Sequence, residues 1–210
     1  FPMFEKVKTK GDGRAELCHT ASYYFYPKNP IYAFATGLPF GLNSRLQNAW
    51  LAVGGGNELL QAFYDRQGIY ALPCGNTGVQ MGGWFRSEIR GLDDLRGLRM
   101  RIGGLAGQVL AKLGVVPQQI AANEIQSALE SGRIDAAEWV GPYDDERLGF
   151  YRVAKNYYYP GWWESGTSLH LFIGLERWRG LPPAYQAAVR AAAAEANMIM
   201  QARYDVQNPA

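Results

Sequence analysis

Residues that cross-link chains or bind transition metals are scarce in this sequence. Only two cysteines and two histidines occur among its 210 residues, too few for a disulfide framework. Cys18 and Cys74 can pair, lie free as small buried side chains or be incidental, and we favour the last interpretation. Neither His19 nor His170 has a second histidine or a cysteine at ligand spacing, so a zinc site is not expected.

An excess of charge of one sign is also missing. The 21 basic and 19 acidic residues leave a net charge of +2, which is too even for electrostatic binding of nucleic acid. No apolar run reaches the roughly 18 residues of a membrane-spanning helix, so none is expected. Apolar residues make up 48% and charged residues 19% of the chain, which indicates a folded globular protein.

Helical and extended patterns alternate along the chain. Helices are expected where apolar residues recur every three or four positions, at 44–53, 59–64, 106–113, 124–131 and 182–206. Strands are expected at shorter apolar or alternating runs, at 69–72, 79–85, 98–102, 115–120, 134–140, 153–159 and 168–175. Ser44 and Asn123 are the expected N-caps of their helices. The alternation predicts an α/β protein with a mostly parallel sheet.

Arg101 ends the predicted strand 98–102, just before Gly103 and Gly104. The carboxyl end of a strand followed by a glycine turn is where α/β folds bind small ligands. A guanidinium at that place can hold a carboxylate through two parallel hydrogen bonds. Strand alternation puts Arg101 on the same face as Arg99, so a position in solvent and a position in a pocket fit the pattern equally well.

The glycines that follow Arg101 also hint at a dinucleotide-binding loop, in which Glu124 would bind the ribose. The spacing of Gly103, Gly104 and Gly107 differs from G-x-G-x-x-G, and Glu124 lies in a predicted helix instead of at the end of a strand. Nucleotide binding is therefore not expected.

Two carboxylates lie among aromatic residues, since Glu138 precedes Trp139 and Glu164 follows two tryptophans. Burial of such a pair requires a compensating cation, and carboxylate, amide and carbonyl oxygens suit Na⁺, Ca²⁺ or Mg²⁺. Solvation or pairing with arginine is the commoner fate of a glutamate, and no nucleophile at suitable spacing supports the third option, a catalytic role. The aromatic run at 22–26 is either a buried edge or a source of hydroxyl groups for a ligand.

Three long motifs follow one another along the chain: ALPCGNTGVQMGGWFR at 71–86, LDDLRGLRMRIGG at 92–104 and NEIQSALESGRIDAAEWVGPYDD at 123–145. They resemble the solute-binding proteins of TRAP transporters, the DctP family. The resemblance extends over essentially the whole chain. It points to the branch whose members bind 2-oxo or 2-hydroxy monocarboxylates, such as pyruvate or lactate, together with a metal ion.

The resemblance implies where the ligand and the ion bind. Arg101 corresponds to the arginine that binds the substrate carboxylate, while Tyr24 and Asn76 correspond to residues that orient the substrate from the other lobe and the hinge. Gln80 corresponds to a side chain at both the substrate and the cation. The expected ligands of a Na⁺ or Ca²⁺ ion are the side-chain or backbone oxygens of four residues, Gln80, Glu138, Trp139 and Glu164.

The family fold implies two α/β lobes of the periplasmic-binding-protein type, joined by strands that cross at a hinge and by a long helix. Residues 1–75 are expected to be part of the first lobe, 76–175 mainly the second lobe with the hinge, and 176–210 the long helix. Because family members are longer and begin with a signal peptide, we expect this chain to be a fragment that lacks both ends.

The implied function is that of a receptor in the periplasm. It captures a small organic acid with a cation, closes over both and delivers the acid to the TRAP membrane permease, without catalysis. A lyase or dehydrogenase acting on a small acid, and a ligand-sensing domain of the same fold, are the alternatives. No nucleic-acid partner is expected, and the long helix could serve a homodimer.

Overall fold

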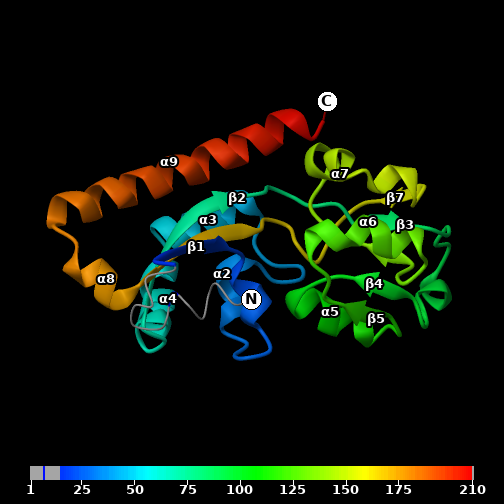
Figure 1. The fold of residues 1–210 in the computed structure, drawn as a ribbon, viewed down its shortest axis with the longest axis horizontal. Helices are drawn as coiled ribbons and strands as arrows, with labels where there is room; N and C mark the ends of the chain where they lie inside the picture. The colour runs from blue at the N-terminus through cyan, green and yellow to red at the C-terminus, as the bar shows by residue number, and fades with distance from the viewer. Residues whose placement is uncertain (1–6, 8–14, 210) are drawn as a thin grey trace.

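The computed structural model describes residue 7 and residues 15–209, which form two lobes beneath one long helix (Figure 1). The first lobe contains an antiparallel sheet with the order β1 (Leu17–Thr20), β8 (Ser168–Gly174) and β2 (Ile69–Asn76). The helices of this lobe are η1 (Ser22–Phe25), α2 (Tyr32–Thr36), α3 (Ser44–Ala52), α4 (Gly56–Asp65) and α8 (Leu175–Gly180).

The second lobe contains a mixed five-stranded sheet. Its strand order is β5 (Val116–Gln118), β4 (Arg99–Arg101), β6 (Ala136–Ala137), β3 (Gly83–Phe85) and β7 (Asn156–Tyr158). Strand β4 is parallel to both of its neighbours, whereas β3 is antiparallel to both of its own. The helices of this lobe are η2 (Leu92–Leu95), α5 (Gly104–Ala111), α6 (Ala122–Glu130), α7 (Pro142–Leu148) and η3 (Phe150–Arg152).

Each sheet buries apolar side chains on both of its faces. In the first lobe, Phe172 of β8 packs with residues of α2, α3 and α4, while its neighbour Ile173 packs with Trp178 and Ala193 on the other side. In the second lobe, Met100 and Ala137 belong to two separate cores on opposite faces. Each lobe therefore has hydrophobic cores of its own. The segments that join the lobes are not part of these sheets, and their side chains are available for a binding site.

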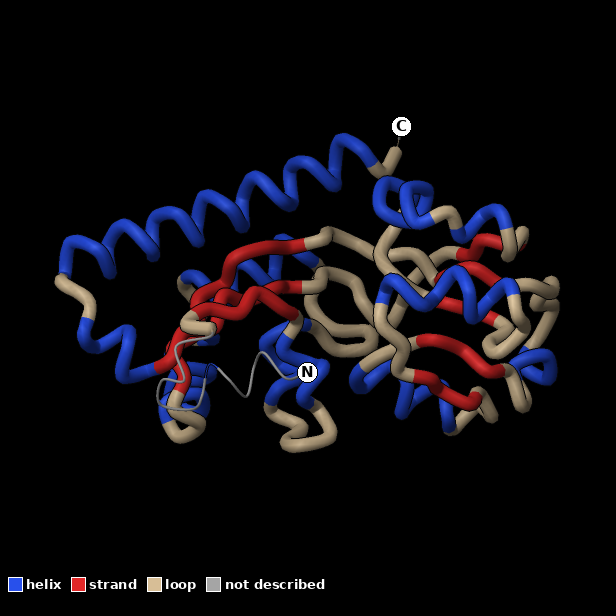
Figure 2. Tube along the Cα trace, viewed as in Figure 1, coloured by secondary structure: helices blue, strands red, loops and turns tan. Residues whose placement is uncertain are grey.

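Two crossing segments join the lobes and run side by side. The chain leaves the first lobe through residues 77–82 and returns through residues 159–167, as the loops between the two groups of strands show (Figure 2). Backbone hydrogen bonds link the segments, from Thr77 N to Thr167 O at 3.0 Å and from Gln80 N to Glu164 O at 3.2 Å. These bonds hold the two crossings together as one hinge.

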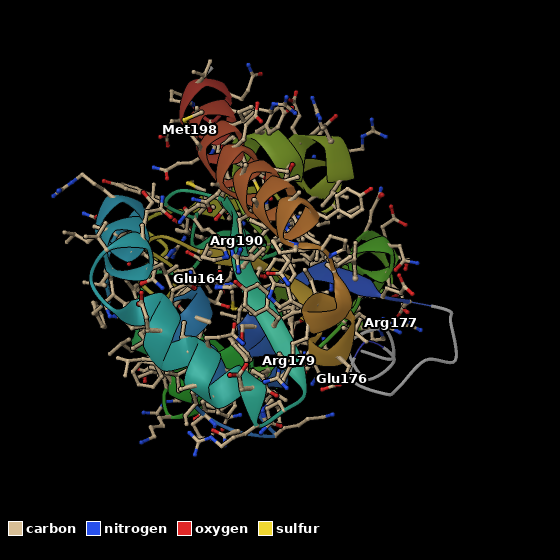
Figure 3. All side chains as sticks on the ribbon, turned by 90° about the vertical axis from the view of Figure 1, so that its left-hand side faces the viewer. Glu164, Glu176, Arg177, Arg179, Arg190 and Met198 are labelled. Carbon is tan, nitrogen blue, oxygen red and sulfur yellow. The ribbon has the colours of Figure 1, made fainter. Side chains whose placement is uncertain are left out.

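Helix α9 (Pro183–Gln207) bridges the lobes on the outside. Near its start, Arg190 lies 4.8 Å from the ring centroid of Trp178, which stacks on Tyr70 of β2 (Figure 3). Near its end, Tyr204 hydrogen-bonds to Asp144 of α7 in the second lobe. The described residues contain no helix that is both long and apolar enough to span a bilayer.

The structure confirms an α/β fold with a long final helix but not a mostly parallel sheet. The first sheet is antiparallel because β8 returns from the second lobe to lie between β1 and β2. The strand expected at 79–85 is only β3, and that expected at 134–140 is only β6, because residues 77–82 and 138–141 leave the sheet to form the hinge and the site. The domain limits at residues 75 and 175 stay a prediction.

Both predicted helix N-caps, Ser44 and Asn123, are wrong. The Oδ1 atom of Asn43 accepts the hydrogen bond from Leu46 N at 3.0 Å, which makes Ser44 the first residue inside α3. Asn123 lies within α6, whose N-cap position is Ala121. The aromatic run at 22–26 is not a strand edge, because its first four residues form η1; a role of its hydroxyl groups toward a ligand stays a prediction.

The cysteines are free, and both are half-buried. Cys18 packs against the core beneath α2, α3 and α4, whereas Cys74 packs against the core beneath α9. The two thiols therefore lie on opposite faces of the first sheet and do not meet.

The buried imidazole of His170 predicts a specific loss of stability in acid. Burial lowers the pKa of His170 to about 3, and neither ring nitrogen has a hydrogen-bond partner among the described residues. An unfolded histidine titrates near about 6.5, so between these values only the unfolded chain binds the proton. The free energy of unfolding should therefore fall as the pH drops through this range, by at most about 1.4 kcal/mol per pH unit.

Replacement of His170 by phenylalanine should flatten this acid dependence, because a phenyl ring does not titrate. The stacked ring of Phe172 can pack against the new side chain. Urea denaturation of the wild type and of His170→Phe between pH 4 and 7 measures the difference. An identical pH dependence in the two proteins would contradict the prediction.

Candidate functional site

Strands β4 and β6 bring a buried ion pair to the carboxyl end of the second sheet. The strands are parallel, and Arg101 is in register with Ala137, so Glu138 follows directly beside it. Atom Nη1 of Arg101 donates to Glu138 Oε2 at 3.1 Å and to the backbone oxygen of Glu138. The two side chains are 3% and 0% exposed. The guanidinium also lies 4.7 Å from the ring centroid of Trp139.

The hinge supplies a second carboxylate and an amide. Glu164 is 5% exposed, and its Oε2 accepts a hydrogen bond from Thr167 Oγ1 at 2.7 Å. Gln80 is 3% exposed, and its Nε2 donates to Thr77 Oγ1 at 3.0 Å. The backbone bond between Gln80 N and Glu164 O joins the two residues directly.

Two tyrosines reach the same place from the first lobe. Both belong to η1, and their ring centroids lie 4.5 Å apart. The Tyr24 hydroxyl is 3.5 Å from Arg101 Nη2. Tyr23 lies beside the Glu164 carboxyl and partly offsets the rise that burial causes in its pKa. The cluster therefore contains side chains from the first lobe, the hinge and the second lobe.

The charges of the cluster do not balance. Burial raises the pKa of Glu164 to about 7, and burial, reinforced by the charge of Glu164, holds the pKa of Glu138 well above its usual range. When both carboxylates are ionised, they face the single guanidinium of Arg101. The excess of one negative charge in a desolvated place is costly unless a proton or another cation neutralises it.

Two buried oxygens of the cluster have no hydrogen-bond partner among the described residues, Gln80 Oε1 and Glu138 Oε1. Both are acceptors, and the hydrogen bond from Gln80 Nε2 to Thr77 fixes which way that amide points. Unpartnered carboxylate and amide oxygens are the ligands that hard cations such as Na⁺ and Ca²⁺ prefer. The residues present therefore fit a bound cation.

Within the described residues, no group of three or more histidine, cysteine, aspartate or glutamate side chains is placed to hold a metal. A cation at this cluster would accordingly need the Gln80 amide and backbone carbonyls besides the carboxylates.

The structure brings six of the seven expected site residues together: Tyr24, Gln80, Arg101, Glu138, Trp139 and Glu164. Glu138 and Glu164 are buried, so the expectation of solvated carboxylates is wrong, while the alternative of pairing with arginine holds for Glu138. The roles of these residues toward a ligand stay predictions.

Asn76 lies apart from this network, at the end of β2. Its Oδ1 accepts from Gly78 N at 2.8 Å, and its Nδ2 donates to Ser168 Oγ at 3.3 Å. These bonds fix the first turn of the hinge, and the expected role of Asn76 toward a substrate stays a prediction.

Sequence reasoning missed two buried residues, Tyr23 and Asp145. Tyr23 was only one of several aromatic residues in its run, and nothing in that run indicates which ring faces the carboxylates. Asp145 lies in the first turn of α7, where the helix dipole favours an acidic side chain even when it is exposed. The sequence therefore gives no sign that Asp145 is buried. In the structure, Asp145 instead accepts hydrogen bonds from Trp84, Val140 and Tyr157, and burial raises its pKa to about 6.

Removal of the buried guanidinium should destabilise the protein far more than removal of an exposed one. Replacement of Arg101 by glutamine leaves Glu138 without its counter-charge, and the free energy of unfolding should fall by about 3 kcal/mol in cation-free buffer. The matched control is Arg99→Gln on the same strand, which breaks the half-exposed pair with Asp135 and should cost less than about 1 kcal/mol. Chemical denaturation measures both, and equal losses would contradict burial of the Arg101 pair.

The sequence as a whole matches known proteins. The bacterial extracellular solute-binding proteins of family 7, DctP, match residues 2–210. A monocarboxylate 2-oxoacid-binding periplasmic protein of Nostoc sp. is 51% identical over 196 residues, which are 93% of this chain and 54% of that protein. The chain thus spans about half the length of this curated relative.

Solved structures share the fold. A TRAP transporter solute-binding protein from Bordetella bronchiseptica, a dimer with copurified calcium and picolinate in one active site, is 52% identical with a TM-score of 0.95; the match covers 99% of this chain and 61% of that one. A second, from Pseudoalteromonas atlantica with bound sodium and pyruvate, is 44% identical with a TM-score of 0.93, over 98% and 61%. This chain therefore belongs to the DctP family, whose members are solute-binding proteins and not enzymes.

Proposed function

We propose that this chain is the larger part of a TRAP transporter receptor that captures a 2-oxo or 2-hydroxy monocarboxylate, such as pyruvate or lactate, together with Na⁺ or Ca²⁺. The observation that carries the proposal is the buried Arg101 in a cluster with two acceptor oxygens, on Gln80 and Glu138, that have no partner within the described part of the chain. Relatives that are 44% to 52% identical hold calcium with picolinate, sodium with pyruvate and calcium with pyruvate.

The chemistry of a 2-oxo acid suits this cluster. The Arg101 fork can hold the carboxylate, while the carboxylate oxygen and the adjacent carbonyl oxygen can share one cation. Glu138, Glu164, the Gln80 amide and the Trp139 backbone carbonyl would hold that cation. A simple amine or a sugar offers no such pair of adjacent anionic and carbonyl oxygens, so the cation contributes to specificity.

Charge counting bears on the identity of the ion. One guanidinium, two carboxylates and one monocarboxylate sum to two negative charges. A divalent ion such as Ca²⁺ therefore neutralises the closed site, whereas Na⁺ leaves one negative charge.

The two lobes would close over the ligand. Tyr23 and Tyr24 come from the first lobe, and Arg101 and Glu138 come from the second. Because the bound acid and its cation contact groups of both lobes, they stabilise the closed form over the open form. That closed form is what a membrane permease would recognise, and no bond is made or broken.

The same proposal places the protein in the periplasm, with the TRAP permease as its membrane partner. The relatives from Nostoc sp. and Pseudoalteromonas atlantica are periplasmic proteins, and the relative from Bordetella bronchiseptica crystallised as a dimer. A homodimer of this chain is accordingly part of the proposal.

The proposal predicts that binding depends on the cation. Titration calorimetry of pyruvate should show one saturable site in the presence of Ca²⁺, and an affinity at least about tenfold weaker after chelation in sodium-free buffer, a loss of about 1.4 kcal/mol or more. No product should form from the acid. Equal affinity with and without cations would overturn the chelate, and steady turnover of pyruvate would favour a lyase or dehydrogenase.

Replacement of Glu138 by glutamine tests the acidic cation ligand. The amide keeps the shape of the side chain but removes its charge, so the cation-dependent part of pyruvate affinity should fall at least about tenfold. Glu124→Gln is the matched control, because Glu124 lies on the surface of α6 with its side chain 55% exposed. Calorimetry in Ca²⁺ buffer compares the two variants, and unchanged binding by Glu138→Gln would remove Glu138 from the site.

A further inference from the structure

The lobes touch each other beside the cluster, where the start of α5 meets the tyrosines of η1. Gly103 and Gly104 follow Ile102, the first residue after β4. A Cβ atom placed on Gly103 would lie 2.9 Å from Cε2 of Tyr23 and 3.3 Å from Cε1 of Tyr24. A Cβ atom on Gly104 would overlap the Tyr23 ring. The two rings therefore occupy the space that side chains would fill on the helix.

Backbone conformation does not explain both glycines. Gly104 has φ +60°, in the left-handed region that favours glycine. Gly103 has φ −103° and ψ 173°, an extended conformation that any residue adopts. Only the approach of the tyrosine rings requires a residue without a side chain at Gly103.

The rings cannot move aside easily. Tyr23 is 6% exposed, and its backbone nitrogen donates to Thr36 Oγ1 at 3.1 Å. The preceding residue, Ser22, is tied to Tyr64 by a 2.6 Å hydrogen bond between their hydroxyls. Tyr23 thus moves with the first lobe, and its position against α5 depends on how far the lobes close.

We infer that Gly103 and Gly104 form a seat that the Tyr23 and Tyr24 rings enter only when the lobes close, and that this seat sets the affinity for the 2-oxo acid. The inference rests on the proposed function. Tyr23 is then a positioning residue, because it brings the closing lobe against Glu164 instead of contacting the cation itself. A side chain in the seat holds the lobes apart and reduces the fraction of protein that reaches the tight closed form.

The experiment compares glycine-to-alanine variants of the full chain by pyruvate calorimetry in Ca²⁺ buffer. Gly103→Ala should weaken binding at least about tenfold, and Gly104→Ala should weaken it further. Two controls lie in the same lobe in open space: Gly91→Ala at an extended position and Gly97→Ala at φ +75°. These should stay within about twofold of the wild type, and melting of the ligand-free variants checks that each is folded.

A second variant pair separates the seat from a general loss of packing. Tyr23→Ala empties the seat, so the addition of Gly103→Ala to Tyr23→Ala should cause little further loss of affinity. Small-angle scattering at saturating pyruvate should show a larger radius of gyration for Gly103→Ala than for the wild type.

The outcomes distinguish this inference from the proposed function. A wild type that does not bind pyruvate with any cation overturns the proposed function. If the wild type binds and Gly103→Ala binds equally well, or if the losses from Tyr23→Ala and Gly103→Ala simply add, the seat is wrong while the proposed function stands.

Discussion

Arg101 is buried at the end of β4, where bulk water cannot balance its charge, so its surroundings must supply the compensation. Glu138 supplies it from the adjacent strand, and Glu164 adds a second carboxylate from the hinge. The result is a cluster with more negative than positive charge and with acceptor oxygens that no described donor satisfies. Such a cluster contributes little to the stability of the fold, but it is well suited to bind a cation and an organic anion together.

The fold delivers these groups from three directions. The second lobe contributes Arg101 and Glu138 from parallel strands, the paired crossing segments contribute Gln80 and Glu164, and η1 of the first lobe contributes its tyrosines. Helix α9 spans the outside from β2 to α7 and connects the lobes away from the site. Because the ligand groups lie on both sides of a hinge, binding and closure are expected to be linked.

Much of the fold was predictable because it depends on local periodicity. The Ala-rich pattern at 182–206 indicated α9, and the short apolar runs indicated most of the strands. The antiparallel first sheet was not predictable from periodicity, because β8 pairs with β2, about 100 residues earlier in the chain, and with β1, about 150 residues earlier. Likewise, the alternation in β4 does not indicate whether Arg101 or Arg99 is buried. That depends on the position of Glu138, which follows β6 directly beside Arg101. Tyr23 and Asp145 acquired their roles only through contacts that the sequence pattern does not encode.

The most direct test of the central claim is an anomalous difference map of crystals grown with Ca²⁺ and pyruvate. The account predicts one strong peak for a Ca²⁺ ion within coordination distance of Gln80 Oε1 and Glu138 Oε1. Pyruvate density should lie between that ion and the Arg101 guanidinium. A peak at any other place, or pyruvate bound with Arg101 turned away from its carboxylate, would contradict it.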